Sequence, residues 1–172
     1  MTMGWRPMAA GDLDAVMGIA AVVHPSYPER REVFAERQAL FPAGCLVAVA
    51  DDAVVGYAVT HPAVTGEPPG LDTLLGALPA GADCLYLHDV AILPAVQGRR
   101  LGEAAFERIR AVAVGNGLAV LALIATPSAR PYWLRHGFAP VAYDRDLEVK
   151  LATYGDGLAY MTRPSREIIP PE

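Results

Sequence analysis

The residues best suited to chemistry lie in segment 94–103, whose sequence is PAVQGRRLGE. This segment follows an apolar run typical of a strand and precedes an amphipathic run typical of a helix. The first N–H groups of a helix lack hydrogen-bond partners and carry partial positive charge. A phosphate group at this point can accept their hydrogen bonds and balance the charge. Gly98 and Gly102 allow close approach to the backbone. Arg99 and Arg100 add positive charge. The segment therefore predicts a diphosphate site; the alternative is an ordinary turn with two solvated arginines.

Two polar residues, His88 and Asp89, interrupt the apolar strand predicted over 84–93. Burying such side chains costs free energy unless they are paired or used in a site. Neighbouring residues of a regular strand point to opposite faces, so we expect that these two do not act together as a dyad. The face predicted for His88 also carries Tyr86, Val90 and Ile92, and that of Asp89 carries Leu87 and Ala91. The alternative role is that of core residues bonded to backbone or to a helix end.

The elements that must position these residues follow from apolar periodicity and from the placement of Gly and Pro. The predicted strands are 3–8, 45–50, 54–61, 84–93, 118–125, one starting at Phe138, and 158–162. The predicted helices are 10–23, 29–40, 98–115 and 128–136. A long loop covers 62–83, with a short helical candidate at 71–77, and long loops are often functional. The succession indicates an α/β (α+β) fold.

Composition limits the remaining possibilities. The 172 residues are 53% hydrophobic and 19% charged, which predicts one domain over 1–163 with a C-terminal extension over 164–172. The net charge of −5 argues against nucleic-acid binding. No apolar run is long enough to cross a membrane and no secretory signal is evident, so we expect a cytoplasmic protein. Cys45 and Cys84 lie in separate apolar runs, which predicts buried free thiols and no metal site.

The QGRRLG sequence after a strand, together with YWLRHGF over 132–138, resembles the GNAT superfamily of acyl-CoA N-acyltransferases. The pyrophosphate loop of that superfamily has Gln or Arg, two residues, Gly, one residue, and Gly or Ala. Here it aligns with Gln97, Gly98, Arg99, Arg100, Leu101 and Gly102. Arg100 departs from the pattern because it replaces a glycine.

The resemblance implies a mixed central sheet of about six to seven strands flanked by about four helices. It also implies acetyl-CoA as co-substrate and no metal, with the pantetheine arm along strand 84–93 where it diverges from strand 118–125. The expected cofactor-binding residues are Val90, Ala91, Ile92, Gln97, Gly98, Arg99, Arg100, Leu101, Gly102 and Glu103.

The implied reaction moves an acetyl or short acyl group to a primary amine of a small molecule or peptide, in a ternary complex. Only roughly one part in 2,500 of an amine with pKa 10.4 is neutral at pH 7, so a base is required, and we expect His88 to serve. The superfamily often uses a tyrosine to protonate the departing thiolate. That position is Trp133 here, and the adjacent Tyr132 is the candidate acid.

The acceptor pocket implied by the resemblance is expected to include Tyr27, His61 and Tyr86. His24, Phe34, Tyr57 and Tyr143 are further lining candidates. A homodimer is possible, as superfamily members often form dimers. The alternative function is that of a non-catalytic acyl-CoA binding or sensing protein, since Arg100 and Trp133 both depart from the usual residues. A partner-binding domain with an accidental motif is the third interpretation.

Overall fold

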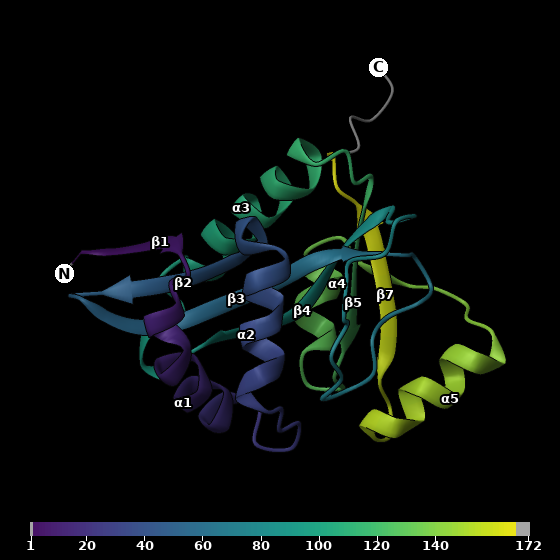
Figure 1. Ribbon diagram of the computed structural model, residues 1–172, viewed down its shortest axis with the longest axis horizontal. Helices are drawn as coiled ribbons and strands as arrows, with labels where there is room; N and C mark the ends of the chain where they lie inside the picture. Colours follow the sequence, from purple (N-terminus) through teal and green to yellow (C-terminus); the bar gives the residue numbers. More distant parts are fainter. Residues whose placement is uncertain (1, 168–172) are drawn as a thin grey trace.

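The structure is a computed structural model that describes residues 2–167. Seven strands in this part of the chain form one twisted sheet in the order β1-β2-β3-β4-β5-β7-β6 (Figure 1). The strands are β1 Met3–Pro7, β2 Cys45–Ala50, β3 Ala53–Ala63, β4 Cys84–Ile92, β5 Val120–Ala125, β6 Ala139–Pro140 and β7 Ala159–Pro164. The β4–β5 pair is parallel, and the other described pairs are antiparallel. The predicted mixed sheet is therefore confirmed.

Helices cover both faces of this sheet. They are α1 Leu13–Val23, α2 Arg31–Leu40, α3 Leu101–Gly115, α4 Arg130–Arg135 and α5 Arg145–Tyr154. The apolar stripes of α1 and α2 pack on Val47, Tyr57 and Val59. The stripe of α3 packs on Leu85, Leu121 and Leu123. Because alternate residues of a strand face opposite sides, these contacts place α1 and α2 on one face and α3 on the other.

Two helices differ between the sequence prediction and the structure. Helix α5 was not predicted, although Asp144 caps it by accepting a hydrogen bond from the Leu147 N–H at 3.0 Å. Its buried residues Leu147 and Leu151 are one helical turn apart. The helical candidate at 71–77 forms turns and irregular backbone instead.

Strand β4 is the place where the sheet opens. It pairs with β5 only over Cys84–Tyr86 and Val120–Ala122, and beyond that point the two strands separate. Along its other edge, β4 pairs with β3 up to its last residue, Ile92. The predicted divergence of these two strands is therefore present, and it leaves one edge of β4 open from residue 87 onward.

A β-bulge in β4 overturns the predicted alternation of its side chains. Val59 is opposite Asp89 but Thr60 is opposite Leu87, so His88 is an extra residue in the ladder. The shift in phase turns His88 and Asp89 to the same face, where His88 contacts Phe34 and Asp89 contacts Tyr57. Leu87 and Ala91, predicted to share a face, pack in clusters on opposite faces.

The expected buried free thiols are present, and part of the expected C-terminal extension lies outside the described residues. Cys45 and Cys84 are buried free thiols, and burial raises their pKa values to about 12 and about 11. Within residues 2–167, no helix has the length and apolar character to cross a membrane, and no cluster of metal-ligating side chains occurs. Residues 168–172 of the expected extension lie outside the described part; within it, the buried Ser165 hydroxyl donates to the Leu118 carbonyl at 2.7 Å.

Candidate active site

A cleft of about 620 Å³ occupies the space where β4 and β5 separate. Its walls come from the open edge of β4, the 97–103 segment, the end of β5, and α4. Nine of the ten predicted cofactor-binding residues line it: Val90, Ala91, Ile92, Gln97, Gly98, Arg100, Leu101, Gly102 and Glu103. Arg99 is exposed in the same segment but is not among the lining residues. His88 and Tyr132, the two predicted catalytic residues, also line the cleft.

The open edge of β4 offers backbone groups to a ligand. In an antiparallel ladder, opposite residues alternate between bonded and non-bonded pairs. Leu93 donates to the Val55 carbonyl at 2.9 Å, so two residues earlier Ala91 also turns its backbone toward β3. Val90 and Ile92 then direct their N–H and C=O groups into the cleft. The Gln97 side chain confirms this direction, since its Nε2 donates to the Ile92 carbonyl at 3.1 Å.

The start of α3 forms the second end of the cleft. The chain reaches it through two residues of positive φ, Gly98 at +77° and Arg100 at +61°. The first backbone bond of this turn runs from the Ala104 N–H to the Arg100 carbonyl. Among the described residues, no side chain caps the N–H groups that precede it. The helix is 15 residues long, so its dipole adds positive potential at this point.

Tyr132 on α4 touches this helix start. A Cβ at Gly102 would lie 2.7 Å from the Tyr132 hydroxyl oxygen, so a side chain at this position would require that hydroxyl to shift. Burial and the charge of Glu103 raise the pKa of Tyr132, which keeps the hydroxyl protonated at neutral pH and able to donate. The neighbouring Trp133 packs against Phe138, with ring centroids 5.3 Å apart, and fills core space.

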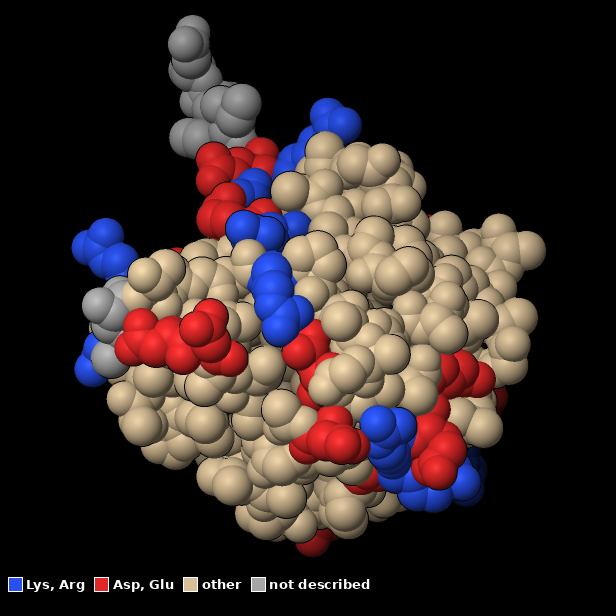
Figure 2. Space-filling model, turned by 60° about the vertical axis from the view of Figure 1, so that its left-hand side comes forward, with Lys and Arg blue, Asp and Glu red and all other residues tan. Residues whose placement is uncertain are grey.

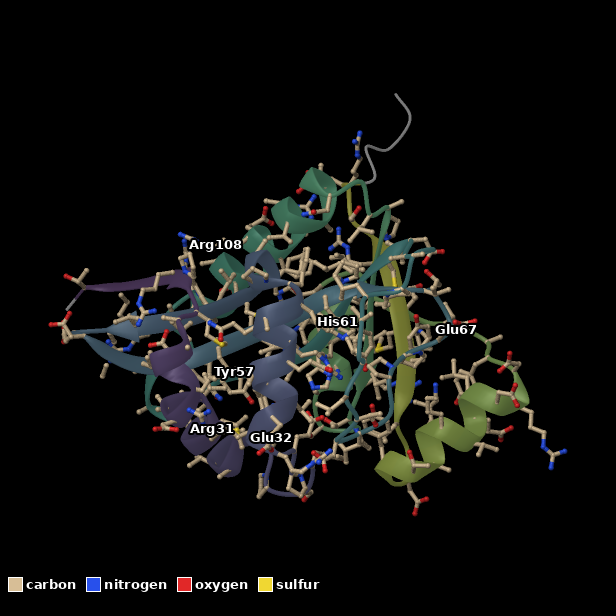
Figure 3. All side chains as sticks on the ribbon, viewed as in Figure 1. Arg31, Glu32, Tyr57, His61, Glu67 and Arg108 are labelled. Atoms are coloured by element: carbon tan, nitrogen blue, oxygen red, sulfur yellow. The ribbon has the colours of Figure 1, made fainter. Side chains whose placement is uncertain are left out.

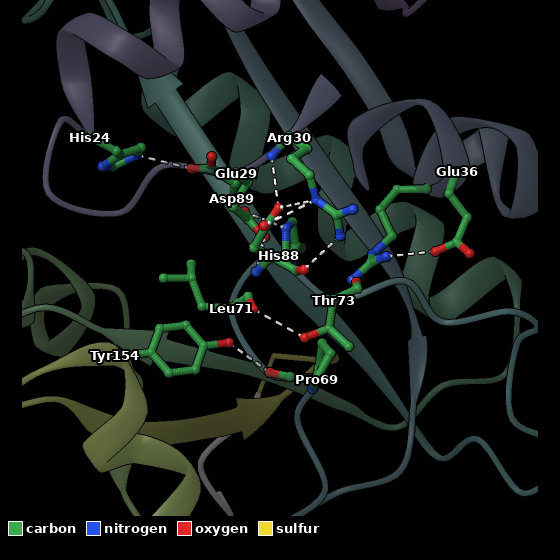
Figure 4. A network of polar contacts seen from close by, with 12 residues as sticks. His24, Glu29, Arg30, Glu36, Pro69, Leu71, Thr73, His88, Asp89 and Tyr154 are labelled. Carbon is green, nitrogen blue, oxygen red and sulfur yellow. Dashed lines mark hydrogen bonds and ion pairs between the residues drawn. The ribbon is translucent and has the colours of Figure 1, made fainter. Parts of the chain in front are cut away.

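His88 lines the cleft from the face of the sheet that α1 and α2 cover, and its side chain is only 3% exposed. Its Nε2 is 2.8 Å from Oε1 of Glu29, whose side chain is 6% exposed (Figure 4). The ring Nδ1 is buried and has no hydrogen-bond partner among the described residues. The arrangement is a carboxylate–imidazole pair with one ring nitrogen left over. Glu29 was not predicted, because it lies 59 positions from His88 in the sequence.

A second carboxylate–imidazole pair stands beside the first. His24 Nε2 is 2.9 Å from Oδ1 of Asp89, and Oδ2 of Asp89 accepts the Tyr57 hydroxyl at 2.5 Å. Burial lowers the pKa of His24, but the interaction with Asp89 and a hydrogen bond to the Val90 backbone outweigh burial and raise it. The charged form of His24 is therefore more stable, relative to the neutral form, than in a free imidazole. It lines the cleft, as does Asp89, whereas the sequence indicated His24 only as one of several lining candidates.

The predicted acceptor residues lie outside the cleft lining. His61 and Tyr86 are buried, with ring centroids 5.5 Å apart, and His61 is 6.1 Å from His88. Figure 3 shows His61 on β3, to the right of α2 in this view. Burial lowers the pKa of His61 to about 4, so its ring is neutral at pH 7. Tyr27 packs at the edge of the cluster that contains Tyr86.

Segment 64–83, here named the strap, covers this side of the site. Glu36 accepts the N–H groups of Leu75 and Gly76 at 2.6 and 2.9 Å. Arg30 is paired with Asp72 in the same region. Helix α5 holds the other end, where Tyr154 donates to the Pro69 carbonyl at 2.6 Å.

On the face drawn in Figure 2, acidic and basic side chains lie close together in small groups.

The sequence matches the acetyltransferase (GNAT) family over residues 14–138. No curated protein matches it. Among solved structures, the GphF GNAT-like decarboxylase in complex with isobutyryl-CoA is similar at a TM-score of 0.75 and 19% identity, covering 95% of this chain and 100% of that one.

Two further solved structures have a similar fold. Naa50 of Arabidopsis thaliana, in complex with a bisubstrate analogue, gives a TM-score of 0.70 at 11% identity and covers 95% and 99% of the two chains. The ribosomal-protein-S18-alanine N-acetyltransferase of Escherichia coli gives 0.66 at 18% identity and covers 98% and 97%. At these identities the likeness concerns the fold. Together with the family match over more than half of its length, it means that this chain belongs to the GNAT acetyltransferase family.

Proposed function

We propose that this protein transfers an acetyl or another short acyl group from a CoA thioester to a primary amine of a small molecule or peptide. The observation that carries the proposal is the cleft itself. The N–H groups of Val90 and Ile92 point into it along one wall, and it runs between the uncapped start of α3 and the buried His88. The edge of β4 can bind an amide-containing arm, the start of α3 can bind an anion, and His88 can accept a proton.

The residues fit acyl-CoA as the donor substrate. A diphosphate accepts hydrogen bonds from the first N–H groups of α3, and Arg100 at the same turn adds a charged donor. The amide groups of pantetheine pair with Val90 and Ile92, which extends the sheet along the open edge of β4. A backbone N–H of β4 also polarises the thioester carbonyl, and such a donor typically contributes about 100- to 1,000-fold in rate.

His88 removes the proton that the reaction releases. The amine nitrogen forms a bond to the acyl carbon, the carbon–sulfur bond breaks, and the amine proton passes to Nδ1 of His88 directly or through water. The sulfur leaves as a thiolate, whose pKa is comparable with the value of about 8.5 for cysteine. Holding both reactants in one cleft supplies on the order of 7–11 kcal/mol of the barrier reduction.

Binding of acetyl-CoA is the first test. We expect micromolar affinity by calorimetry, weakened tenfold or more by Arg100→Glu, which reverses a charge at the diphosphate site. Arg108→Glu makes the same change on the exposed face of α3 and should leave affinity within about twofold. Absence of binding to the folded protein would overturn the proposal.

Turnover separates the enzyme from a non-catalytic acyl-CoA binding protein. With acetyl-CoA and a panel of amines and peptides, we expect CoA release that requires an amine and that His88→Ala slows by about 100-fold or more. Binding without amine-dependent release would favour the sensing function. A rate for His88→Ala within twofold of the parent would remove this residue as the base.

Tyr132 is proposed to protonate the departing thiolate. Its hydroxyl lies at the α3 end of the cleft, so a contact with the diphosphate is the competing role. Tyr132→Phe distinguishes the two: a fall in kcat with KM for acetyl-CoA unchanged supports the acid, and a rise in KM with kcat unchanged assigns the hydroxyl to diphosphate binding.

A further inference from the structure

Glu29 is a buried carboxylate with two partners from different parts of the molecule. Its Oε1 is 2.8 Å from Nε2 of His88, and its Oε2 accepts the backbone N–H of Asp72 in the strap at 3.0 Å. Glu29 itself lies just before α2, between the two helices that cover this face. One side chain therefore connects the candidate base to the segment that covers it.

We propose that Glu29 is a positioning residue for His88: it holds the imidazole in the tautomer that can accept a proton and links it to the strap. The proposal rests on the proposed function, because it assumes that His88 is the base. Glu29 acts through His88 and through the Asp72 backbone, and it is not among the residues that line the cleft.

The tautomer follows from hydrogen-bond accounting. An ionised carboxylate only accepts hydrogen bonds, so the His88 nitrogen that faces Glu29 carries the hydrogen. The neutral ring then has its lone pair on Nδ1, the nitrogen with no partner among the described residues. The opposite tautomer would place a hydrogen on Nδ1 and leave no site for the proton of the amine. After proton transfer, the same carboxylate stabilises the imidazolium.

The other groups around His88 cannot fix this tautomer. The rings of Phe34, His61 and Tyr86 lie with centroids 6.1 to 6.3 Å from that of His88. His61 has its Nδ1 at 2.9 Å from the Pro62 carbonyl, so that nitrogen carries a hydrogen and its buried Nε2 is an acceptor. Among the described residues, Glu29 is the group that bonds to the His88 ring.

Glu36, on the adjoining helix α2, offers a matched control. It is also a carboxylate that holds the strap, through the N–H groups of Leu75 and Gly76, and it has no bond to His88. Substitution of Glu36 by Gln weakens the strap contact without changing the partner of the base. Substitution of Glu29 by Gln weakens the strap contact and also changes the hydrogen-bond partner of His88. The new amide can donate to Nε2 of His88 and so favour the tautomer with the hydrogen on Nδ1.

The experiment compares Glu29→Gln, Glu29→Asp and Glu36→Gln in the full chain, with thermal unfolding and acetyl-CoA affinity as controls for folding. We expect Glu29→Gln to lower kcat at least tenfold, with partial recovery in Glu29→Asp. Glu36→Gln should keep kcat within about threefold and raise KM for the amine. Equal kcat losses in Glu29→Gln and Glu36→Gln would overturn the proposal.

A spectroscopic readout tests the tautomer without turnover. Long-range ¹H–¹⁵N spectra of the four histidine rings, with His88→Ala identifying its signals, should show the Nε2–H form in the parent and loss of that form in Glu29→Gln. An unchanged His88 tautomer in Glu29→Gln would overturn the positioning role. If the parent shows the Nε2–H form but releases no CoA with any amine, the proposed function fails while the tautomer assignment stands.

Discussion

Arg100 adopts a φ of +61° at the position where the pyrophosphate pattern of the family has glycine. A non-glycine residue in this left-handed conformation destabilises the folded state by about 1–2 kcal/mol, which a glycine would avoid. The greater backbone entropy of glycine in the unfolded chain offsets roughly 0.5–1 kcal/mol of this gain in stability. We therefore predict that Arg100→Gly raises the free energy of unfolding by up to about 1 kcal/mol and weakens acetyl-CoA binding three- to tenfold. Chemical denaturation and calorimetry measure the two effects.

Arg100→Ala separates strain from charge. Alanine keeps the strained backbone conformation and removes the guanidinium, so affinity should fall as in Arg100→Gly without the gain in stability. If glycine and alanine variants unfold at the same denaturant concentration, the left-handed conformation of Arg100 stores no strain.

At the residue scale, the sequence could identify the candidate diphosphate segment but not the partners of the proposed base. Gly98 and Gly102 next to paired arginines carry a local signal, and the structure places both glycines in the cleft. The sheet face to which His88 and Asp89 point depends on a bulge that inserts one residue into the ladder. The amino-acid sequence of this strand carries no signal for that bulge. Glu29 reaches His88 only through the tertiary fold.

At the scale of elements, strand β4 makes a testable prediction about alternate residues. The N–H groups of Val90 and Ile92 point into the cleft, and that of Ala91 points to β3. Addition of acetyl-CoA should therefore slow amide hydrogen exchange at Val90 and Ile92 at least tenfold while Ala91, protected already, changes little. Residue-resolved exchange by NMR gives the measurement. Equal protection of all three amides without ligand would contradict the alternation.

The elements with a strong apolar period were predictable, and those defined by tertiary contacts were not. The stripe of Leu101, Ala105 and Ile109 indicated α3 directly. Helix α5 has an N-cap at Asp144 and two core leucines, which is a usable but short signal. The sequence of the strap has no periodic pattern of hydrophobic residues. Its path is set by side chains of other elements, such as Glu36 and Tyr154, that bind its backbone.

At the scale of the whole molecule, the sheet consists of two halves joined at a short seam. Strands β1 to β4 form one half, β5 to β7 form the other, and the β4–β5 ladder covers only Cys84–Tyr86 opposite Val120–Ala122. Helix α3 reinforces the seam, since its apolar face contacts Leu85 of β4 and Leu121 of β5 within one cluster. The separation that forms the cleft thus removes ladder bonds that a continuous sheet would have.

A ligand in the cleft should restore part of this missing cohesion. Acetyl-CoA at 100 times its Kd stabilises the folded state by about 2.7 kcal/mol through mass action alone. For a chain of this size, roughly 2–4 °C per kcal/mol predicts a rise in Tm of roughly 5–10 °C. Differential scanning calorimetry over a series of ligand concentrations should show Tm rising with the logarithm of concentration, and Arg100→Glu should need about tenfold more ligand for the same rise. Because a ligand that bridges the seam couples both halves, the transition should stay a single peak throughout; a split into two peaks, with only one moved by ligand, would mean that acetyl-CoA binds one half of the sheet alone.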